Sequence, residues 1–266
     1  MSRSLGIDTY SVVFRSFYAV HASPQPTRDA LAVMSKMIEK AAQSTNPHYV
    51  FAAADCPEPT FRHKLDPNYK ASRKPAPPEL KELIPLALQQ LEQIGIPVLR
   101  CPGYEADDVL ATLAKQLKEG HQLDVLSSDR DLVGMVRPGV DLLLMQNGGV
   151  QKRIDCANAS SLFGVDPSLV ADYKALAGDA SDNISGVVGI GPKTTLALLN
   201  EHGSLQAILE KRASLSGKAA LLIKDEAAET ALLCQQLAQL NDQAPVDFAV
   251  ADSLWSDEKL ARLRSA

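Results

Sequence analysis

The sequence predicts an α/β fold in which a mostly parallel sheet flanked by helices is followed by a helical region. Up to about residue 165, short apolar runs that end in an acid alternate with helical patterns, as expected for a parallel sheet covered on both faces. Beyond that point the spacing of apolar residues is helical only, and a glycine-rich turn interrupts it. We therefore expect a first domain over residues 1–165, a helical region over residues 166–250 and a tail over residues 251–266.

Three apolar runs predict strands, and each run is followed directly by an aspartate. They are Ser4–Ile7 before Asp8, Tyr49–Ala54 before Asp55, and Leu123–Ser128 before Asp129. A shorter run at Pro97–Leu99 precedes further acids. Because ligands of open parallel sheets bind outside the carboxyl ends of the strands, these aspartates mark a candidate site.

Helices are predicted where apolar residues recur at helical spacing. In the first domain these segments are Ala30–Ala42, Pro78–Ile94 and Glu105–Glu119, and in the helical region they are Pro167–Ala177, Lys193–His202 and Ala219–Leu240. Pro85 interrupts the second pattern and is expected to kink it. The stretch from Asp66 to Pro78 is basic, proline-rich and irregular, and the segment Val246–Ala266 has no periodicity from which to place it.

Composition is that of a globular protein, with 45% hydrophobic residues. No run approaches the ~18–20 apolar residues of a membrane span. The first residues lead straight into a strand pattern without a signal peptide. Four cysteines without a CxxC pair argue against a zinc site or a disulfide scaffold. We expect a cytoplasmic protein with reduced thiols.

Nine acids are expected to contribute to one metal site. They are Asp8, Asp55, Glu105, Asp107, Asp108, Asp129, Asp131, Asp179 and Asp182. Each alone could be a turn residue or could complement a helix dipole, but several such acids at one sheet edge would repel each other without cations. Oxygen ligands suit Mg²⁺ or Mn²⁺, and this number of carboxylates favours two or more ions. Without these nine charges the net charge of the chain would be +4 instead of −5. The acidic net charge therefore does not exclude a basic DNA-binding surface elsewhere on the protein.

Several motifs resemble those of the 5′-nuclease family, which includes the 5′→3′ exonuclease domain of DNA polymerase I and stand-alone bacterial flap endonucleases. The motifs are Phe14-Arg-Ser-Phe-Tyr-Ala, Phe61-Arg-His, Tyr69-Lys-Ala-Ser-Arg73, Gly103-Tyr-Glu-Ala-Asp-Asp, Ser128-Asp-Arg-Asp-Leu and the run from Gly178 to Thr194. The resemblance covers about residues 5–240. It implies a PIN-like domain with a helical arch at about residues 66–95, followed by a helix–three-turn–helix motif that binds duplex DNA.

The resemblance also assigns roles to residues. All nine acids match the metal acids of the family, Lys70 and Arg73 match its active-site cations, and Arg15 matches a substrate-contacting arginine. The family usually has glycine after its first acid, whereas this chain has Thr9. A K⁺ ion is implied at the main-chain carbonyls of Leu176, Ala177, Ser185, Val187 and Ile190.

The turn from Gly186 to Lys193 is the second candidate binding element. It is neither GxGxxG nor a P-loop, because Pro192 separates Gly191 from Lys193. A glycine turn before a helix can present amides to a phosphate, although a tight helix–helix turn is the alternative. The expected DNA contacts are Arg15, Tyr69, Lys74, Gly186, Gly189, Gly191, Lys193 and Thr194. Tyr69 and Tyr104 could stack on bases or could belong to the core.

We therefore expect a monomeric, Mg²⁺-dependent 5′→3′ exonuclease or flap endonuclease, in which Mn²⁺ can substitute for Mg²⁺. It would act on flaps, nicks and overhangs with free 5′ ends and leave 5′-phosphates. Two alternatives remain open: a PIN-type ribonuclease, which would lack the Gly186–Lys193 turn, and a DNA-junction-binding protein without catalysis.

Overall fold

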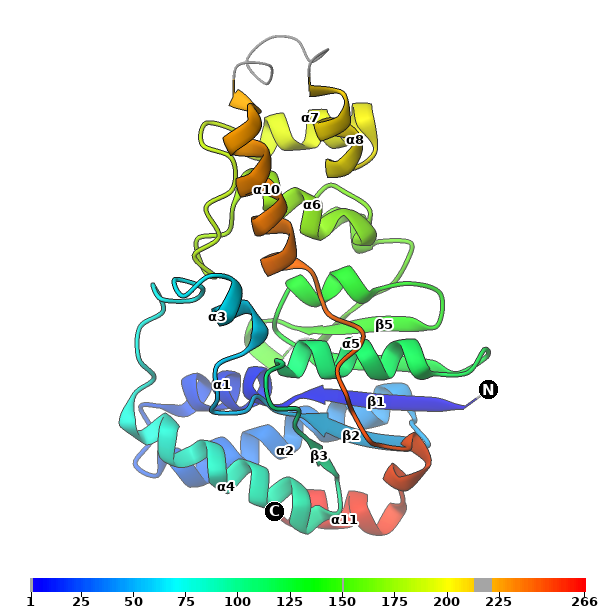
Figure 1. Cartoon of the computed structure of the whole chain (residues 1–266). Helices are drawn as coiled ribbons and strands as arrows, with labels where there is room; N and C mark the ends of the chain where they lie inside the picture. Colours follow the sequence, from blue (N-terminus) through cyan, green and yellow to red (C-terminus); the bar gives the residue numbers. More distant parts are fainter. Residues whose placement is uncertain (1, 150, 213–221) are drawn as a thin grey trace. The chain divides into compact units, whose positions relative to one another are not determined.

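The computed structural model describes residues 2–149, 151–212 and 222–266, and the chain forms two compact units. Unit 1 comprises residues 1–58, 75–156 and 241–266, and unit 2 comprises residues 59–74 and 157–240 (Figure 1). Each unit is thus built from segments that lie far apart in the sequence. Residues 59–74 group with the helical region, and the expected tail, residues 251–266, is part of unit 1.

Unit 1 contains a six-stranded sheet with the strand order β3-β2-β1-β4-β5-β6. The strands are β1 (Arg3–Asp8), β2 (Tyr49–Ala53), β3 (Val98–Leu99), β4 (Gln122–Ser127), β5 (Val140–Met145) and β6 (Gln151–Ile154). All neighbours are parallel except β5 and β6, which are antiparallel. The predicted mostly parallel sheet is confirmed, and β5 and β6 are strands for which the sequence analysis gave no prediction.

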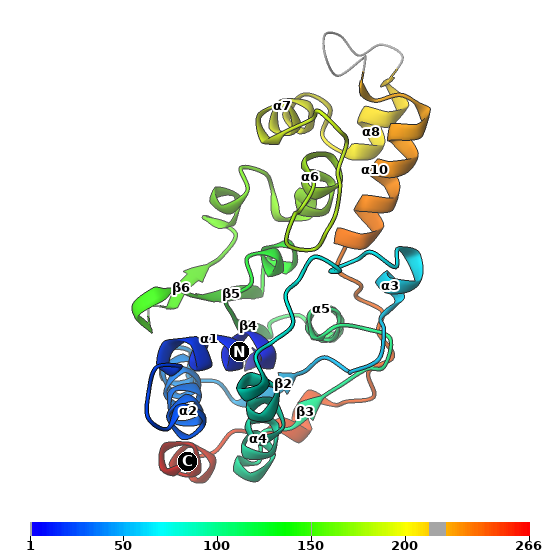
Figure 2. The same ribbon diagram turned by 90° about the vertical axis from the view of Figure 1, so that its left-hand side faces the viewer.

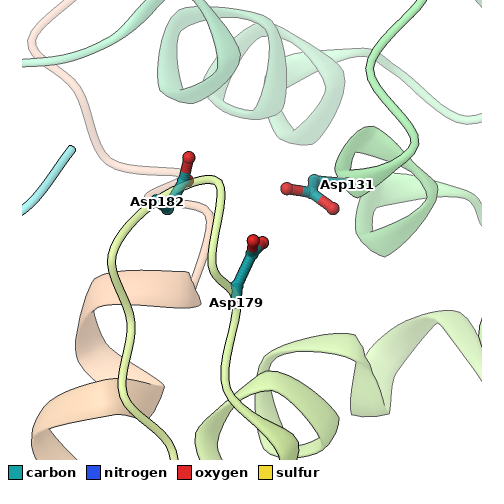
Figure 3. A group of neighbouring side chains, drawn as sticks. All are labelled: Asp131, Asp179 and Asp182. Carbon is teal, nitrogen blue, oxygen red and sulfur yellow. The ribbon is translucent and has the colours of Figure 1, made fainter. Parts of the chain in front are cut away.

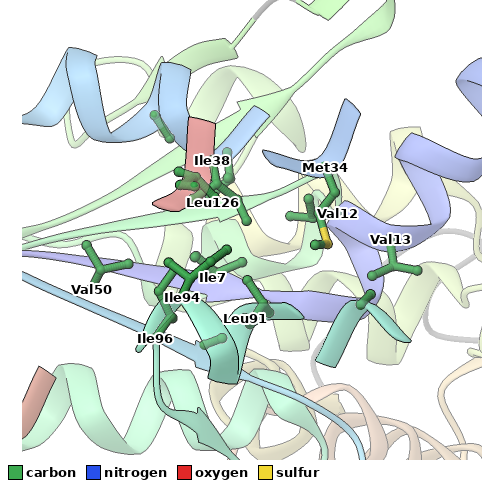
Figure 4. Close-up of a cluster of buried hydrophobic side chains, with 14 of the residues drawn as sticks. Ile7, Val12, Val13, Met34, Ile38, Val50, Leu91, Ile94, Ile96 and Leu126 are labelled. Atoms are coloured by element: carbon green, nitrogen blue, oxygen red, sulfur yellow. The ribbon is translucent and has the colours of Figure 1, made fainter. Parts of the chain in front are cut away.

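Helices cover both faces of this sheet (Figure 2). One face packs against α1 (Thr9–Val20), α2 (Pro26–Thr45), α4 (Pro78–Ile94) and α11 (Asp257–Ser265). Ile7, Val12, Met34 and Leu91 are buried in the resulting core (Figure 4). The other face packs against α5 (Ala106–Gln116), where a Cβ added to Gly6 would lie 3.0 Å from a methyl group of Leu110. Glycine in β1 therefore lets α5 approach the sheet closely.

Helix α4 has the bounds that its apolar spacing predicts, and it continues through Pro85. Its residues Leu80, Leu83 and Leu91 are fully buried in the core of unit 1. The helical part of the segment expected to form an arch is therefore a core element. Residues 66–77 are the part that lacks regular structure.

Unit 2 is helical, as predicted. Among its described residues the α-helices are α3 (Phe61–Leu65), α6 (Val170–Ala177), α7 (Pro192–His202), α8 (Leu205–Glu210) and α10 (Asp225–Ala238). Residues 219–221 of the helix predicted at Ala219–Leu240 lie outside the described residues. Arg62 in α3 is 2% exposed and donates hydrogen bonds of 2.8 Å to the carbonyl oxygens of Leu237 and Gln239. These bonds satisfy carbonyl groups at the end of α10 and join residues 59–74 to unit 2.

The segment Val246–Ala266, for which no structure was predicted, returns to the sheet of unit 1. It contains a 3₁₀ turn (Val250–Ser253) and α11. The Trp255 N–H donates to the His48 carbonyl at 2.8 Å, and Leu263 is fully buried. Within the described ranges, no helix has the length and apolar character needed to cross a membrane.

Candidate functional site

Three aspartates lie where adjacent parallel strands end in unit 1. Asp8 is the last residue of β1, Asp55 follows β2 by two residues, and Asp129 follows β4 by two residues. Because β1 lies between β2 and β4, the three carboxylates come from neighbouring strands at the carboxyl edge of the sheet. This is the edge at which open parallel sheets bind ligands.

Asp8 is held from two directions. Its carboxylate accepts the Ser11 N–H of α1 at 3.2 Å, which caps the helix, and the Ser127 hydroxyl of β4 at 2.6 Å. The side chain is buried, and burial is the main reason that the pKa of Asp8 rises from 3.8 to about 7. The negative charges of Asp129 and Asp55 raise this pKa further, whereas the two hydrogen bonds lower it.

The first turn of α5 supplies two more acids to the same edge. The helix begins after Glu105, and its Ala106 N–H donates to an oxygen of Asp55 at 2.7 Å. Burial raises the pKa of Asp107 well above its usual value. The charges of Asp8, Asp129, Glu105 and Asp55 raise it further, in that order. The structure therefore gathers five of the predicted acids into one carboxylate cluster: Asp8, Asp55, Glu105, Asp107 and Asp129.

Asp131 belongs to the same loop as Asp129. Its N–H donates to Asp129 Oδ1 at 2.8 Å, and it begins a 3₁₀ helix, η1 (Asp131–Met135). The Asp129 N–H in turn donates to the Ser127 hydroxyl at 2.9 Å. These short-range bonds fix the direction of the Asp129 carboxylate immediately after β4.

Asp108 differs from its neighbour Asp107, although both were expected to bind metal. It is fully buried, and its two oxygens accept main-chain N–H groups: Oδ2 from Glu105 at 3.0 Å and Oδ1 from Asn241 at 2.8 Å. Successive residues of a helix point about 100° apart. The structure thus uses the second aspartate of the Glu-Ala-Asp-Asp motif as a hydrogen-bond acceptor for the main chain.

The remaining two predicted acids lie in unit 2, in the turn that follows α6 (Figure 3). The buried ammonium of Lys174 contacts Asp179 Oδ2 at 2.6 Å, and the Ser181 hydroxyl donates to Asp179 Oδ1 at 2.6 Å. Burial acts to raise the pKa of Asp179, but these hydrogen bonds outweigh it and lower the pKa to about 2. Asp179 therefore has a cationic partner within its own unit, and sequence analysis did not single out Lys174.

The two residues predicted to be catalytic cations contact the same turn, Arg73 through its side chain and Lys70 through its main chain. Arg73 Nη2 lies 2.5 Å from Asp182 Oδ1, and the Lys70 N–H donates to the Asp182 carbonyl at 2.9 Å. The Lys70 ammonium lies 5.0 Å from the centre of the Tyr69 ring. Tyr69 is 3% exposed, packs edge-on against His63, and donates its hydroxyl to Asp182 at 3.3 Å. Because Tyr69 is buried, the structure favours a core role for it and not stacking on bases.

The glycine-rich turn of unit 2 contains two residues in the left-handed backbone region, which favours glycine. Gly186 and Gly189 have φ values of +64° and +85°, and a Cβ on Gly186 would lie 2.4 Å from the Gly178 nitrogen. Nothing lies within 4 Å of a Cβ placed on Gly191, which precedes α7. Lys193 is exposed and Thr194 half-buried in the first turn of α7.

The residues expected to hold K⁺ lie in this turn of unit 2 and in the segment before it. They are Leu176, Ala177, Ser185, Val187 and Ile190. Two of their carbonyls accept N–H groups within the set: Leu176 from Val187 at 3.0 Å and Val187 from Ile190 at 2.9 Å.

Arg15 of α1 lines a hollow of about 440 Å³ in unit 1. Phe14, Tyr18 and Ser128 line the same hollow, and the Arg15 guanidinium donates to the Asn147 side chain at 3.4 Å. Ser128 directly precedes Asp129, so this aromatic and cationic hollow adjoins the carboxylate cluster. Lys74, at the end of unit 2's first segment, is exposed.

Comparisons with known proteins agree with this architecture. Residues 3–164 match the 5′-3′ exonuclease N-terminal resolvase-like domain, and residues 165–260 match the 5′-3′ exonuclease C-terminal SAM fold. A 5′-3′ exonuclease of Aquifex aeolicus is 36% identical over 77% of this chain and 71% of its own length. DNA polymerase I of Bacillus caldotenax is 33% identical over 95% of this chain, which spans 29% of the polymerase.

Solved structures show the same fold. T5 5′-exonuclease with bound divalent metal ions (zinc) aligns with a TM-score of 0.76 and 21% identity over 99% of this chain and 97% of that one. The catalytic core of Rad2 in complex with DNA substrate aligns with a TM-score of 0.60 and 15% identity over 99% and 86%.

The mostly parallel sheet with an acidic carboxyl edge and the helical C-terminal region define an α/β protein with a candidate metal site. The two family matches together span nearly the whole sequence. The chain belongs to the 5′-3′ exonuclease family.

The raised pKa values of Asp8 and Asp107 predict how stability depends on pH in EDTA. An acid whose pKa is raised by folding stabilises the fold below its unfolded pKa, here 3.8, and that contribution is lost as pH rises through the folded pKa, about 7 for Asp8. The melting temperature of the metal-free protein should therefore fall between about pH 4 and about pH 7. Asp8→Asn should flatten this fall and melt above the wild type at the higher pH.

Asp166→Asn is the matched control. The pKa of Asp166 is lowered, first by the Ser168 hydroxyl, so its stabilising effect is lost only in more acidic solution. This variant should keep the wild-type slope. The melting temperatures are measured by thermal denaturation across the pH series. If Asp8→Asn kept the wild-type dependence of melting temperature on pH, Asp8 would not be the group whose raised pKa causes the fall.

Proposed function

We propose that this chain is a Mg²⁺-dependent, structure-specific 5′-nuclease that hydrolyses phosphodiesters of DNA near free 5′ ends and leaves 5′-phosphates. It acts as a monomer on flaps, nicks and 5′ overhangs. The observation that supports this most directly is the cluster of five carboxylates at the sheet edge of a chain that belongs to the 5′-3′ exonuclease family.

The chemistry of the cluster fits divalent cations. Its donors are all carboxylate oxygens, which suit Mg²⁺ and Mn²⁺. The raised pKa values of Asp8 and Asp107 reflect repulsion and burial that bound cations would offset. Asp8, Asp55, Glu105, Asp107 and Asp129 would hold metal, and Asp131, Asp179 and Asp182 complete the proposed set. When bound by these residues, two ions would supply Lewis-acid activation of the phosphate and would lower the pKa of a bound water.

Side chains outside the cluster would bind and orient the substrate. Lys70 and Arg73 are proposed to neutralise charge that develops on the scissile phosphate. Arg15, with Phe14 and Tyr18, provides a cation and aromatic surface beside Ser128, which suits a nucleotide of the substrate strand.

In unit 2, the turn from Gly186 to Gly191 and the start of α7 are proposed to bind the duplex backbone. Main-chain N–H groups at a helix start bind phosphate well, and Lys193 adds a positive charge. The carbonyls of Leu176, Ala177, Ser185, Val187 and Ile190 would hold K⁺ in this turn. Duplex binding should then be tighter in KCl than in LiCl at equal ionic strength.

A panel of labelled substrates tests the proposal. Flap, nicked and 5′-overhang DNA should be cut in Mg²⁺ or Mn²⁺, should yield 5′-phosphates, and should stay intact in EDTA. Ca²⁺ should support binding with little cleavage, because its looser coordination positions the reacting groups poorly. Preferential cleavage of RNA would favour a ribonuclease, and binding without cleavage in any metal would favour a junction-binding protein.

Lys70→Met tests the role of the ammonium. Methionine keeps an unbranched chain beside Tyr69 and removes the charge. If the charge acts on the transition state, the single-turnover rate at saturating flap DNA should drop by ~10²–10³-fold, with a much smaller change in Kd. The matched control, Lys64→Met at an exposed lysine of α3, should change neither the rate nor the Kd. A change in Kd alone would make Lys70 a backbone contact.

Gly191→Val tests the turn. The site has room for a side chain and φ is −104°, so the variant should fold normally. A side chain should nevertheless block close approach of a phosphate to the main chain. Duplex affinity, measured in Ca²⁺, should fall by at least roughly 10-fold, about the energy of one strong contact. Single-turnover cleavage at saturating DNA should change less, and unchanged affinity would refute the contact.

A further inference from the structure

Residues 241–245, which lie downstream of α10, form a strap that crosses α5 (Figure 1). Thr112 anchors it at two points: its hydroxyl accepts the Ala244 N–H at 3.0 Å and donates to the Asn241 carbonyl at 3.4 Å. Lys115 pairs with Asp242 at 2.8 Å at the exposed edge. All of these residues belong to unit 1.

Asp108 joins this strap to the carboxylate cluster. One of its oxygens accepts the Asn241 N–H of the strap, and the other accepts the N–H of Glu105, a member of the cluster. Thr112 lies one helical turn after Asp108 on the same side of α5, so the two residues contact the strap side by side. Asp107, one residue earlier, faces the cluster instead.

We propose that Asp108 is a positioning residue, not a metal ligand, and that the strap fixes the place of Glu105 through it. The inference rests on the proposed metal centre of this chain. The Asp108 carboxylate is fully buried and accepts two main-chain N–H groups. If it rotated, one of these N–H groups would lose its acceptor, which is costly in a buried site, so the carboxylate is held rigidly. Partners that orient metal ligands in this way typically change metal affinity by ~10–100-fold when they are lost.

The test uses Thr112, which lies outside the cluster. Thr112→Val keeps the volume of the side chain but removes the hydroxyl that holds the strap, whereas Thr112→Ser keeps it. Mn²⁺ is titrated calorimetrically into the metal-free full-length protein without DNA. The expected result is a rise in the Mn²⁺ Kd of roughly 10-fold or more for Thr112→Val and a nearly unchanged Kd for Thr112→Ser. An unchanged Kd in folded Thr112→Val would overturn the inference.

A double-mutant cycle of Asp108 and Glu105 provides an independent measurement. It applies even if Thr112→Val does not fold. If Asp108 acts through Glu105, Asp108→Asn should weaken Mn²⁺ binding in the wild type but add nothing in a Glu105→Ala background. Equal losses in both backgrounds would identify Asp108 as a ligand in its own right. Wild-type protein that binds no Mn²⁺ would instead refute the proposed metal centre, so the two failures are distinguishable.

Discussion

Electrostatic repulsion among carboxylates at the carboxyl edge of the sheet is the constraint around which unit 1 is arranged. Three of the acids are fixed by strand register, because β2, β1 and β4 are adjacent and parallel. The other two sit at the start of α5, where the positive end of the helix dipole favours negative charge. Asp8 likewise caps α1. The fold therefore brings the acids together and offsets part of their repulsion with helix N-termini and hydroxyl donors.

The pKa of an aspartate is shifted in opposite directions in the two units. Asp8 has burial and like charges around it, so its pKa rises to about 7. Asp179 is also partly buried, yet a buried lysine and a serine hydroxyl lower its pKa to about 2. An acid without a cationic partner gains most from a bound divalent ion, whereas a lysine-paired acid is already ionised and held in place. The two surroundings therefore shift the pKa of the same carboxyl group in opposite directions.

Sequence patterns predicted the parts of this structure that depend on local periodicity. The strands before Asp8, Asp55 and Asp129 and helix α4 follow directly from spacing, and their burial confirms it. Pairing between distant segments could not be predicted in this way. Arg62 reaches the end of α10 across 175 residues of sequence, and Trp255 reaches His48. Both use main-chain acceptors, for which no residue type is diagnostic, so no motif could indicate them.

The contrast between Asp107 and Asp108 shows where motif-based assignment reaches its limit. The motif Glu105-Ala-Asp-Asp marks both aspartates as candidate ligands, but the rotation of about 100° per helical residue sends adjacent side chains to different surroundings. One surrounding consists of carboxylates and the other of main-chain N–H donors. One of those donors comes from residue 241, far along the chain, and only the folded structure brings it to Asp108. An acid that matches a metal motif can therefore contribute by holding a ligand in place, and the partner that decides its role can lie outside the motif.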